Sequence, residues 1–183
     1  QVHLIGIDRD KQALAQSSRR LGEHSSRFRA VHATYDAIGQ VAAAYHDEDY
    51  PLSGILMDLG VSSLQLDDAA RGFSYARDTD LDMRMDQSSG KTAADLLAEL
   101  SEVELTKILR EAGEEKFAAR IAREIVKTRE KTPLTSSAQL VEIVRDAIPA
   151  PARRTGGNPA KRTFQALRIA VNQELSILKR AIP

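Results

Sequence analysis

The apolar positions in the first third of the chain follow a strand–helix–strand pattern. Residues Val2–Ile7 and Arg27–Tyr35 are rich in β-favouring residues and predict two strands, and the helical spacing of apolar residues between them predicts a helix. A short helix is expected at Ala37–Tyr45. The apolar run Ile55–Met57 then predicts a third strand, buried and central. Alternating strands and helices of this kind are typical of an α/β protein with a parallel sheet.

Beyond residue 86 the pattern becomes purely helical. Four helices are predicted before a proline-rich stop, at Thr92–Leu100, Glu102–Ala112, Lys116–Lys127 and from a Thr135–Ser137 cap to about Ile148. A single long helix, Ala160–Ala181, follows. We therefore expect residues 1–71 to be the first part of an α/β domain, residues 72–159 to be an all-helical insertion, and residues 160–183 to be the helix that returns to the α/β domain.

Three candidate ligand residues close the three predicted strands: Asp8, Tyr35 and Asp58. In a parallel sheet their positions meet at one edge, where α/β proteins bind ligands, and a carboxylate there can accept hydrogen bonds from ribose hydroxyls. The alternatives are that Asp8 or Asp10 only caps the following helix and that Tyr35 only closes the core. The glycine-rich turns of dehydrogenases and of P-loop enzymes are both absent, which leaves a nucleotide-dependent oxidoreductase a weak reading.

The composition narrows the function classes. The chain has 183 residues, of which 42% are hydrophobic and 28% charged, without an apolar run long enough to cross a bilayer or a visible secretion signal, so the cytoplasm is the expected location. The absence of cysteine excludes disulfides, thiolate metal sites and a cysteine nucleophile. The four histidines show no ligand spacing, and no metal is expected.

Charge is balanced overall but uneven along the chain. The stretch from Arg153 to Arg168 has five basic residues and no acidic one. The candidate RNA-binding residues there are Arg153, Arg154, Lys161 and Arg162, the last two at the start of a helix, where free N–H groups favour phosphate. The alternative is a solvated basic loop.

Residues 54–86, GILMDLGVSSLQLDDAARGFSYARDTDLDMRMD, form a polar but patterned loop that is too long to be an ordinary connection. Its aspartates are expected to cap turns or to pair with Arg71, Arg77 and Arg84. Together with GEEKFAARIAREIV and KRTFQALRIAVNQEL, this loop resembles the ribosomal RNA small-subunit methyltransferase H family, also called the MraW family. The resemblance runs from about Val2 to Ile182. A target base of such an enzyme must leave its stack, and Phe73 and Tyr75 are the candidates to hold it, although packing is favoured for Phe73.

The resemblance implies a class I, Rossmann-like methyltransferase sheet, incomplete in this chain, with an inserted helical domain. It implies transfer of a methyl group from S-adenosyl-L-methionine to N4 of one cytidine in bacterial small-subunit (16S) ribosomal RNA. Asp8 would hold the donor's ribose, Tyr35 would lie at its adenine, and Asp58 and Gln65 would contact it near the reacting centre, with Asp58 as the catalytic candidate. The partner would be small-subunit ribosomal RNA or the assembled 30S subunit, with no membrane, and a homodimer is left open.

The family's glycine-rich donor loop, expected before Val2, and the later strands, expected after Ile182, are not in this chain. We therefore expect an internal segment of a longer protein that alone neither binds the donor nor folds stably. The alternative function, from a different class, is a helical nucleic-acid or protein interaction module whose sheet remnant is not catalytic.

Overall fold

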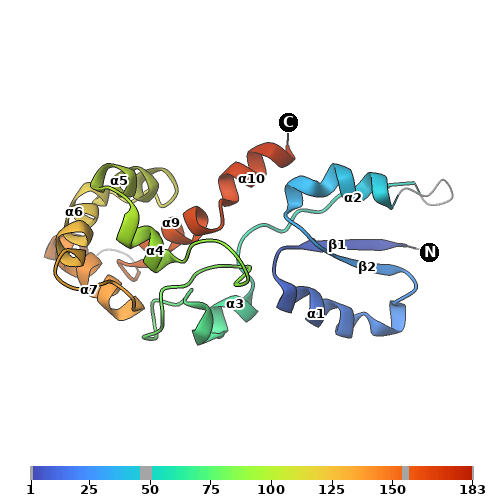
Figure 1. Ribbon diagram of the computed structural model, residues 1–183, viewed down its shortest axis with the longest axis horizontal. Helices are drawn as coiled ribbons and strands as arrows, with labels where there is room; N and C mark the ends of the chain where they lie inside the picture. Colours follow the sequence, from blue (N-terminus) through green and yellow to red (C-terminus); the bar gives the residue numbers. More distant parts are fainter. Residues whose placement is uncertain (1, 46–50, 154–156, 183) are drawn as a thin grey trace. The chain divides into compact units, whose positions relative to one another are not determined.

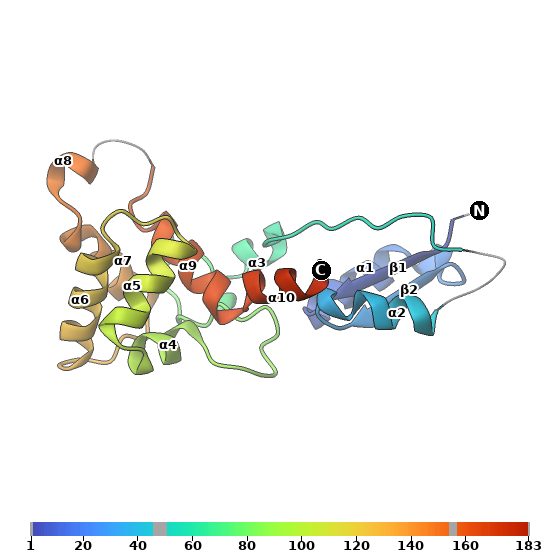
Figure 2. The same ribbon diagram turned by 90° about the horizontal axis from the view of Figure 1, so that it is seen from above.

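The computed structural model describes residues 2–45, 51–153 and 157–182, and the chain divides into two compact units. The sheet unit comprises residues 1–60 and 174–183, and the helical unit comprises residues 61–173. Figures 1 and 2 label their strands and α-helices. Each unit is described by itself.

The sheet unit is built on a parallel strand–helix–strand motif. Strand β1 (Leu4–Asp8) pairs in parallel with β2 (Phe28–His32), so that Asp8 lies opposite His32, and helix α1 (Lys11–Arg20) connects them. The 3-10 helix η1 (Gly22–His24) precedes β2, and η2 (Tyr35–Ala37) and α2 (Ile38–Ala44) follow it. Helices α1 and α2 lie on opposite sides of the two strands in Figure 1. The two predicted outer strands and their helices are confirmed.

The predicted central strand at Ile55–Met57 is wrong for this structure. Residues 51–59 have no regular secondary structure, and Ile55 and Leu56 are 59% and 94% exposed. A β-strand needs a neighbour for its backbone N–H and C=O groups. Within the described part of the chain the sheet consists of β1 and β2 alone, and neither pairs with this segment. The extended teal run that leads into α3 in Figure 2 contains this stretch.

The helical unit starts with short elements and continues as a packed bundle. Its elements are α3 (Ser63–Asp67), η3 (Ala69–Arg71), α4 (Ala93–Glu99), α5 (Glu102–Glu111), α6 (Ala118–Arg129), α7 (Ser137–Ala147), α8 (Ala150–Arg153) and α9 (Lys161–Val171). Capping boxes at Thr92, Ser101 and Ser136 fix where α4, α5 and α7 begin, because each side chain accepts a hydrogen bond from a first-turn N–H. The four helices predicted between residues 92 and 148 are therefore confirmed.

The core of the helical unit is extensive and apolar. Leu97, Leu105, Leu109, Ile121 and Leu140 are completely buried and come from four different helices. By contrast, the buried hydrophobic side chains described in the sheet unit are Val41 and Ile177. Burial of apolar surface is the main stabilising contribution to a fold, so the helical unit holds most of the stability of the described chain.

The long helix predicted at Ala160–Ala181 is two helices, and its prediction as one is wrong. Helix α9 ends with Asn172 as its C-cap, Gln173 adopts a positive φ of 52°, and α10 (Glu174–Ala181) begins directly afterwards. An asparagine after the last apolar residue of a helical pattern is a stop signal, and a left-handed residue commonly follows. The continuing apolar spacing conceals this break in the sequence.

The contacts divide the chain at 60/61 and 173/174, whereas the sequence places domain boundaries at 71/72 and 159/160. Helix α9 packs against α4 and α5, which is why it belongs to the helical unit. The close approach depends on Gly113, since a Cβ there would lie 2.5 Å from the carbonyl oxygen of Arg162. The predicted functional domains stay a prediction, because compact packing and functional division need not coincide.

Candidate functional site

The first residue of the candidate site is an aspartate at the end of a strand. Asp8 is the last residue of β1, its side chain is exposed, and its Oδ1 accepts the Asp10 N–H at 2.7 Å. Asp10 is the residue that caps α1, with its Oδ1 accepting the Gln12 N–H at 2.9 Å. Partial desolvation by the surrounding protein raises the pKa of Asp8, and the Asp10 carboxylate adds to this against the hydrogen bond from the Asp10 amide. Of the two aspartates, Asp8 is therefore the one available to a ligand.

Tyr35 follows the neighbouring strand end. It begins η2, three residues after His32, the register partner of Asp8, so both residues belong to the carboxyl edge of the same strand pair. The Tyr35 hydroxyl donates a hydrogen bond to the carbonyl oxygen of Glu174 at 2.8 Å. Partial burial, followed by the nearby Glu174, raises the pKa of Tyr35. Its hydroxyl is thus used within the protein, which leaves the ring for contact with a flat ligand.

The other two donor candidates do not belong to the strand pair. Asp58 lies on the exposed segment without regular structure and outside the sheet. Gln65 belongs to the helical unit, is 5% exposed, and its Oε1 accepts the Ser62 N–H at 3.1 Å at the start of α3. The third strand that was expected to bring Asp58 to the sheet edge is not formed in this structure, so the meeting of Asp8, Tyr35 and Asp58 stays a prediction.

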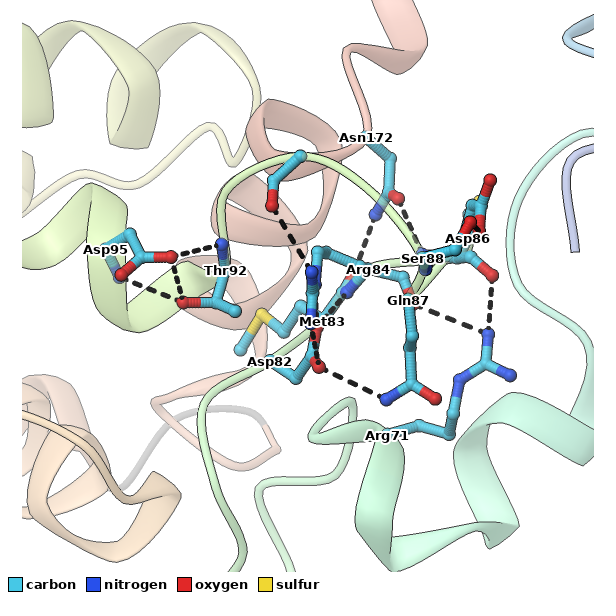
Figure 3. Close-up of polar contacts among 12 residues, drawn as sticks. Arg71, Asp82, Met83, Arg84, Asp86, Gln87, Ser88, Thr92, Asp95 and Asn172 are labelled. Carbon is cyan, nitrogen blue, oxygen red and sulfur yellow. Dashed lines mark hydrogen bonds and ion pairs between the residues drawn. The ribbon is translucent and has the colours of Figure 1, made fainter.

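A buried loop in the helical unit, residues 82–86, is held by polar contacts (Figure 3). Arg84 pairs with Asp82 through Nε at 2.7 Å and Nη2 at 2.9 Å. Met83 is completely buried and adopts a positive φ of 61°, which is unfavourable for a residue with a side chain. Arg71 donates from Nη2 to the Met85 carbonyl at 2.8 Å. The expected pairing of loop aspartates with loop arginines is confirmed for Asp82 and Arg84.

Asn172 is the residue of this cluster that the sequence reasoning missed. Its Oδ1 accepts the Met85 N–H at 2.8 Å, and its Nδ2 donates to the carbonyls of Met83 at 2.7 Å and Arg168 at 2.9 Å. Figure 3 shows the amide directed at the loop backbone. At 1% exposure it is a buried polar side chain with donor and acceptor both used. The signal in the sequence was a lone asparagine at the end of the apolar pattern of α9.

The Asp82–Arg84 pair should make the stability of the helical unit depend on pH. Burial alone would raise the pKa of Asp82, but hydrogen bonds from Arg84 outweigh it and hold the pKa below its usual 3.8. A depressed carboxyl pKa contributes stability that is present above the unfolded value and is lost as pH falls through the folded value. We expect Asp82→Asn to cost about 1–2 kcal/mol at pH 7 and to reduce the loss of stability below about pH 4.

Urea denaturation between pH 2 and pH 7 measures this effect, with the exposed Glu111→Gln as control. An unchanged pH profile in Asp82→Asn would contradict the assignment.

The two aromatic candidates for holding a base both pack inside the helical unit. Phe73 is buried, and the Arg71 guanidinium lies 6.0 Å from its ring centroid. Tyr75 makes an edge-to-face contact with Phe164 at 5.8 Å between centroids. The preferred reading of Phe73 as a packing residue is confirmed.

The predicted basic residues differ in how far they are engaged. Lys161 is exposed at the first position of α9, whereas Arg162 donates from Nη1 to the Glu114 carbonyl at 2.7 Å. Arg153 ends α8 and is half-buried, and Arg154 lies outside the described residues. The first N–H groups of α9 are partly used as well, because Asn158 accepts from Ala160 and Lys161. Among the described members of this group, Lys161 and Arg162 are therefore the exposed cations, and the guanidinium of Arg162 is engaged with the Glu114 carbonyl.

The described residues offer neither a metal-binding cluster nor a membrane-spanning helix. No cluster of three or more His, Asp or Glu side chains there could bind a metal ion. None of the helices described is both long and apolar enough to span a bilayer.

A parallel strand–helix–strand unit with an exposed carboxylate after its first strand is the arrangement of Rossmann-like nucleotide-binding proteins. A family model described as the MraW methylase family matches residues 1–183, and the chain belongs to that family. The α/β, Rossmann-like class expected from the sequence is thereby confirmed, with a partial sheet of two strands in the part of the chain that the structure describes.

Curated relatives agree with this assignment. A protein of Beutenbergia cavernae named "Ribosomal RNA small subunit methyltransferase H" is 60% identical over 182 residues, covering 100% of this chain and 54% of its own length. The protein of the same name from Frankia alni is 58% identical over 184 residues, covering 100% of this chain and 56% of its own length. The chain thus spans about half the length of the curated relatives it matches.

Proposed function

We propose that this chain is part of an S-adenosyl-L-methionine-dependent methyltransferase that modifies N4 of a cytidine in bacterial small-subunit (16S) ribosomal RNA. The observation that carries the proposal is identity of 60% to a protein named ribosomal RNA small subunit methyltransferase H along the whole chain. The exposed carboxylate of Asp8 at a parallel strand end supports a nucleoside-containing ligand. The proposed location is the cytoplasm, where ribosomal RNA is found.

When bound, S-adenosyl-L-methionine supplies a methyl group on a positively charged sulfur. Asp8 would accept hydrogen bonds from the ribose hydroxyls, and the Tyr35 ring would lie against the adenine. Asp58 and Gln65 would contact the donor near the reacting centre, as the family resemblance implies. Because the lone pair of the exocyclic amine is delocalised into the cytosine ring, the protein must orient that amine, and an Asp58 carboxylate can accept a hydrogen bond from its N–H. No cysteine is needed, because N4 attacks without a covalent adduct at the ring.

The experiment that tests this proposal uses a full-length protein of the family that carries this chain. It is incubated with methyl-labelled donor and either naked 16S ribosomal RNA or assembled 30S subunits. Label in RNA with either substrate supports the proposal and identifies the preferred form. Labelling of neither substrate would contradict it.

The RNA contact is proposed to include Lys161 and Arg153. Replacing either with glutamate should weaken RNA binding and lower the slope of log K against log salt by about 1 for each lost phosphate contact. Filter binding across a salt series measures the slope, with Lys107→Glu on α5 as a control for charge alone. Equal effects of Lys107→Glu and Lys161→Glu would show that only net charge matters.

A second candidate is a helical interaction module with a non-catalytic sheet remnant. The concentration of buried apolar side chains in the helical unit favours it. RNA or protein binding without methyl transfer by the full-length protein would distinguish it from the first.

A further inference from the structure

The turn that carries Tyr35 is held against α10 by polar side-chain contacts. The Asp36 Oδ2 accepts a hydrogen bond from Nε of Arg180 at 2.8 Å and forms an ion pair with its Nη2, also at 2.8 Å. The Thr34 hydroxyl donates a hydrogen bond to the Asp36 Oδ1 at 2.5 Å. Tyr35 donates a hydrogen bond to the Glu174 carbonyl of α10. Two consecutive residues, Tyr35 and Asp36, therefore bond directly to α10, and Thr34 orients the Asp36 carboxylate. Helix α10 also packs against η2, and its Ile177 is buried.

The electrostatics of the turn agree with a fixed ion pair. The hydrogen bond from Thr34 and the neighbouring Arg180 together hold the pKa of Asp36 below its ordinary value, against a smaller effect of burial. The Asp36 side chain is 18% exposed and that of Arg180 is 55% exposed. Pairs as exposed as this one contribute little to stability, so its main consequence is geometric.

These contacts restrict the orientation of the Tyr35 ring. A tyrosine side chain has two torsion angles, and both are restricted when the backbone is held in η2 and the hydroxyl is held by the Glu174 carbonyl. The Asp36–Arg180 pair keeps α10, and with it that carbonyl, against the turn. A ring fixed in advance loses less conformational entropy when a flat ligand stacks on it.

We propose that Asp36 and Arg180 are positioning residues for the methyl donor, which set the Tyr35 ring where the donor's adenine stacks. The inference rests on the proposed function, since it assigns an adenosine-containing ligand to the sheet edge. Neither residue contacts the ligand. Their loss should therefore weaken donor binding and leave the methyl-transfer step itself intact.

The test measures donor affinity and turnover separately in the full-length protein carrying this chain. In Arg180→Ala, the dissociation constant for S-adenosyl-L-methionine and the inhibition constant of free adenosine should both rise about tenfold, with kcat at saturating donor and the KM for RNA within about twofold. Tyr35→Phe, which keeps the ring but loses the hydroxyl contact, should shift the two adenosine-dependent constants in the same direction. Arg180→Lys should recover part of the loss, because it keeps the charge but not the planar donor group.

Lys179→Ala, a neighbour on α10, is the matched control and should behave as the wild type. The wild-type protein could methylate RNA while Arg180→Ala leaves the dissociation constant for the donor and the inhibition constant of adenosine unchanged. That result would overturn the positioning role alone. A fall in kcat with unchanged donor affinity would overturn it as well. Failure of the wild-type protein to bind the donor would instead overturn the proposed function, and the inference with it.

Discussion

Asn172→Ala should destabilise the helical unit by about 2–5 kcal/mol. The substitution leaves the Met85 N–H and the Met83 carbonyl buried without their present partner, and an unsatisfied buried polar group costs about 1–3 kcal/mol. It also removes the contact that holds Met83 in a left-handed conformation. Urea denaturation followed by circular dichroism measures the change in the free energy of unfolding.

The exposed Lys107→Ala on the same unit is the control and should change stability by less than about 0.5 kcal/mol. Asn172→Asp separates the two halves of the amide. It keeps the acceptor for Met85 but places a carboxylate against the Met83 carbonyl, so it should be destabilising at pH 7 and recover as the acid is protonated. A loss below about 1 kcal/mol in Asn172→Ala would mean that the loop does not depend on this side chain.

Asp58→Ala should reduce methyl transfer by at least about 100-fold in the full-length protein carrying this chain, while RNA affinity changes little. The expected size is that of a group which assists proton transfer or holds a reactant in place. The measurement is the single-turnover rate of label transfer to RNA, together with RNA binding by the same variant.

Two further variants make this result specific. Asp58→Asn keeps the shape and removes the proton acceptor, so a collapse there as deep as in Asp58→Ala favours a proton-accepting role over donor binding alone. The exposed Asp146→Ala on α7 controls for the loss of one carboxylate. Wild-type rates in Asp58→Ala would remove Asp58 from the mechanism.

Local signals predicted most of the fold. The strands β1 and β2 were visible in their apolar residues, and α4, α5 and α7 in their capping residues, because these features act over a few neighbouring positions. Ile55–Met57 carries an equally clear β pattern, yet it forms no strand, and Ile55 and Leu56 are exposed. The pattern shows that a segment can form a strand, but a strand forms only where another backbone is in place to pair with it.

The candidate site was predictable only in part for a related reason. The positions of Asp8 and Tyr35 follow from where strands end, which the sequence shows directly. The roles of Asn172, Asp36 and Arg180 depend on partners between 87 and 144 residues away, and no spacing rule links such pairs. Their identification required the coordinates.

We propose that the protein to which this chain belongs methylates a cytidine amine in small-subunit ribosomal RNA. The decisive experiment is mass spectrometry of nucleosides from 16S ribosomal RNA after incubation with S-adenosyl-L-methionine and the full-length protein carrying this chain. The expected result is one new nucleoside, N4-methylcytidine, that is missing when the donor is omitted. Methylation at C5 of cytosine, or no new nucleoside at all, would contradict it.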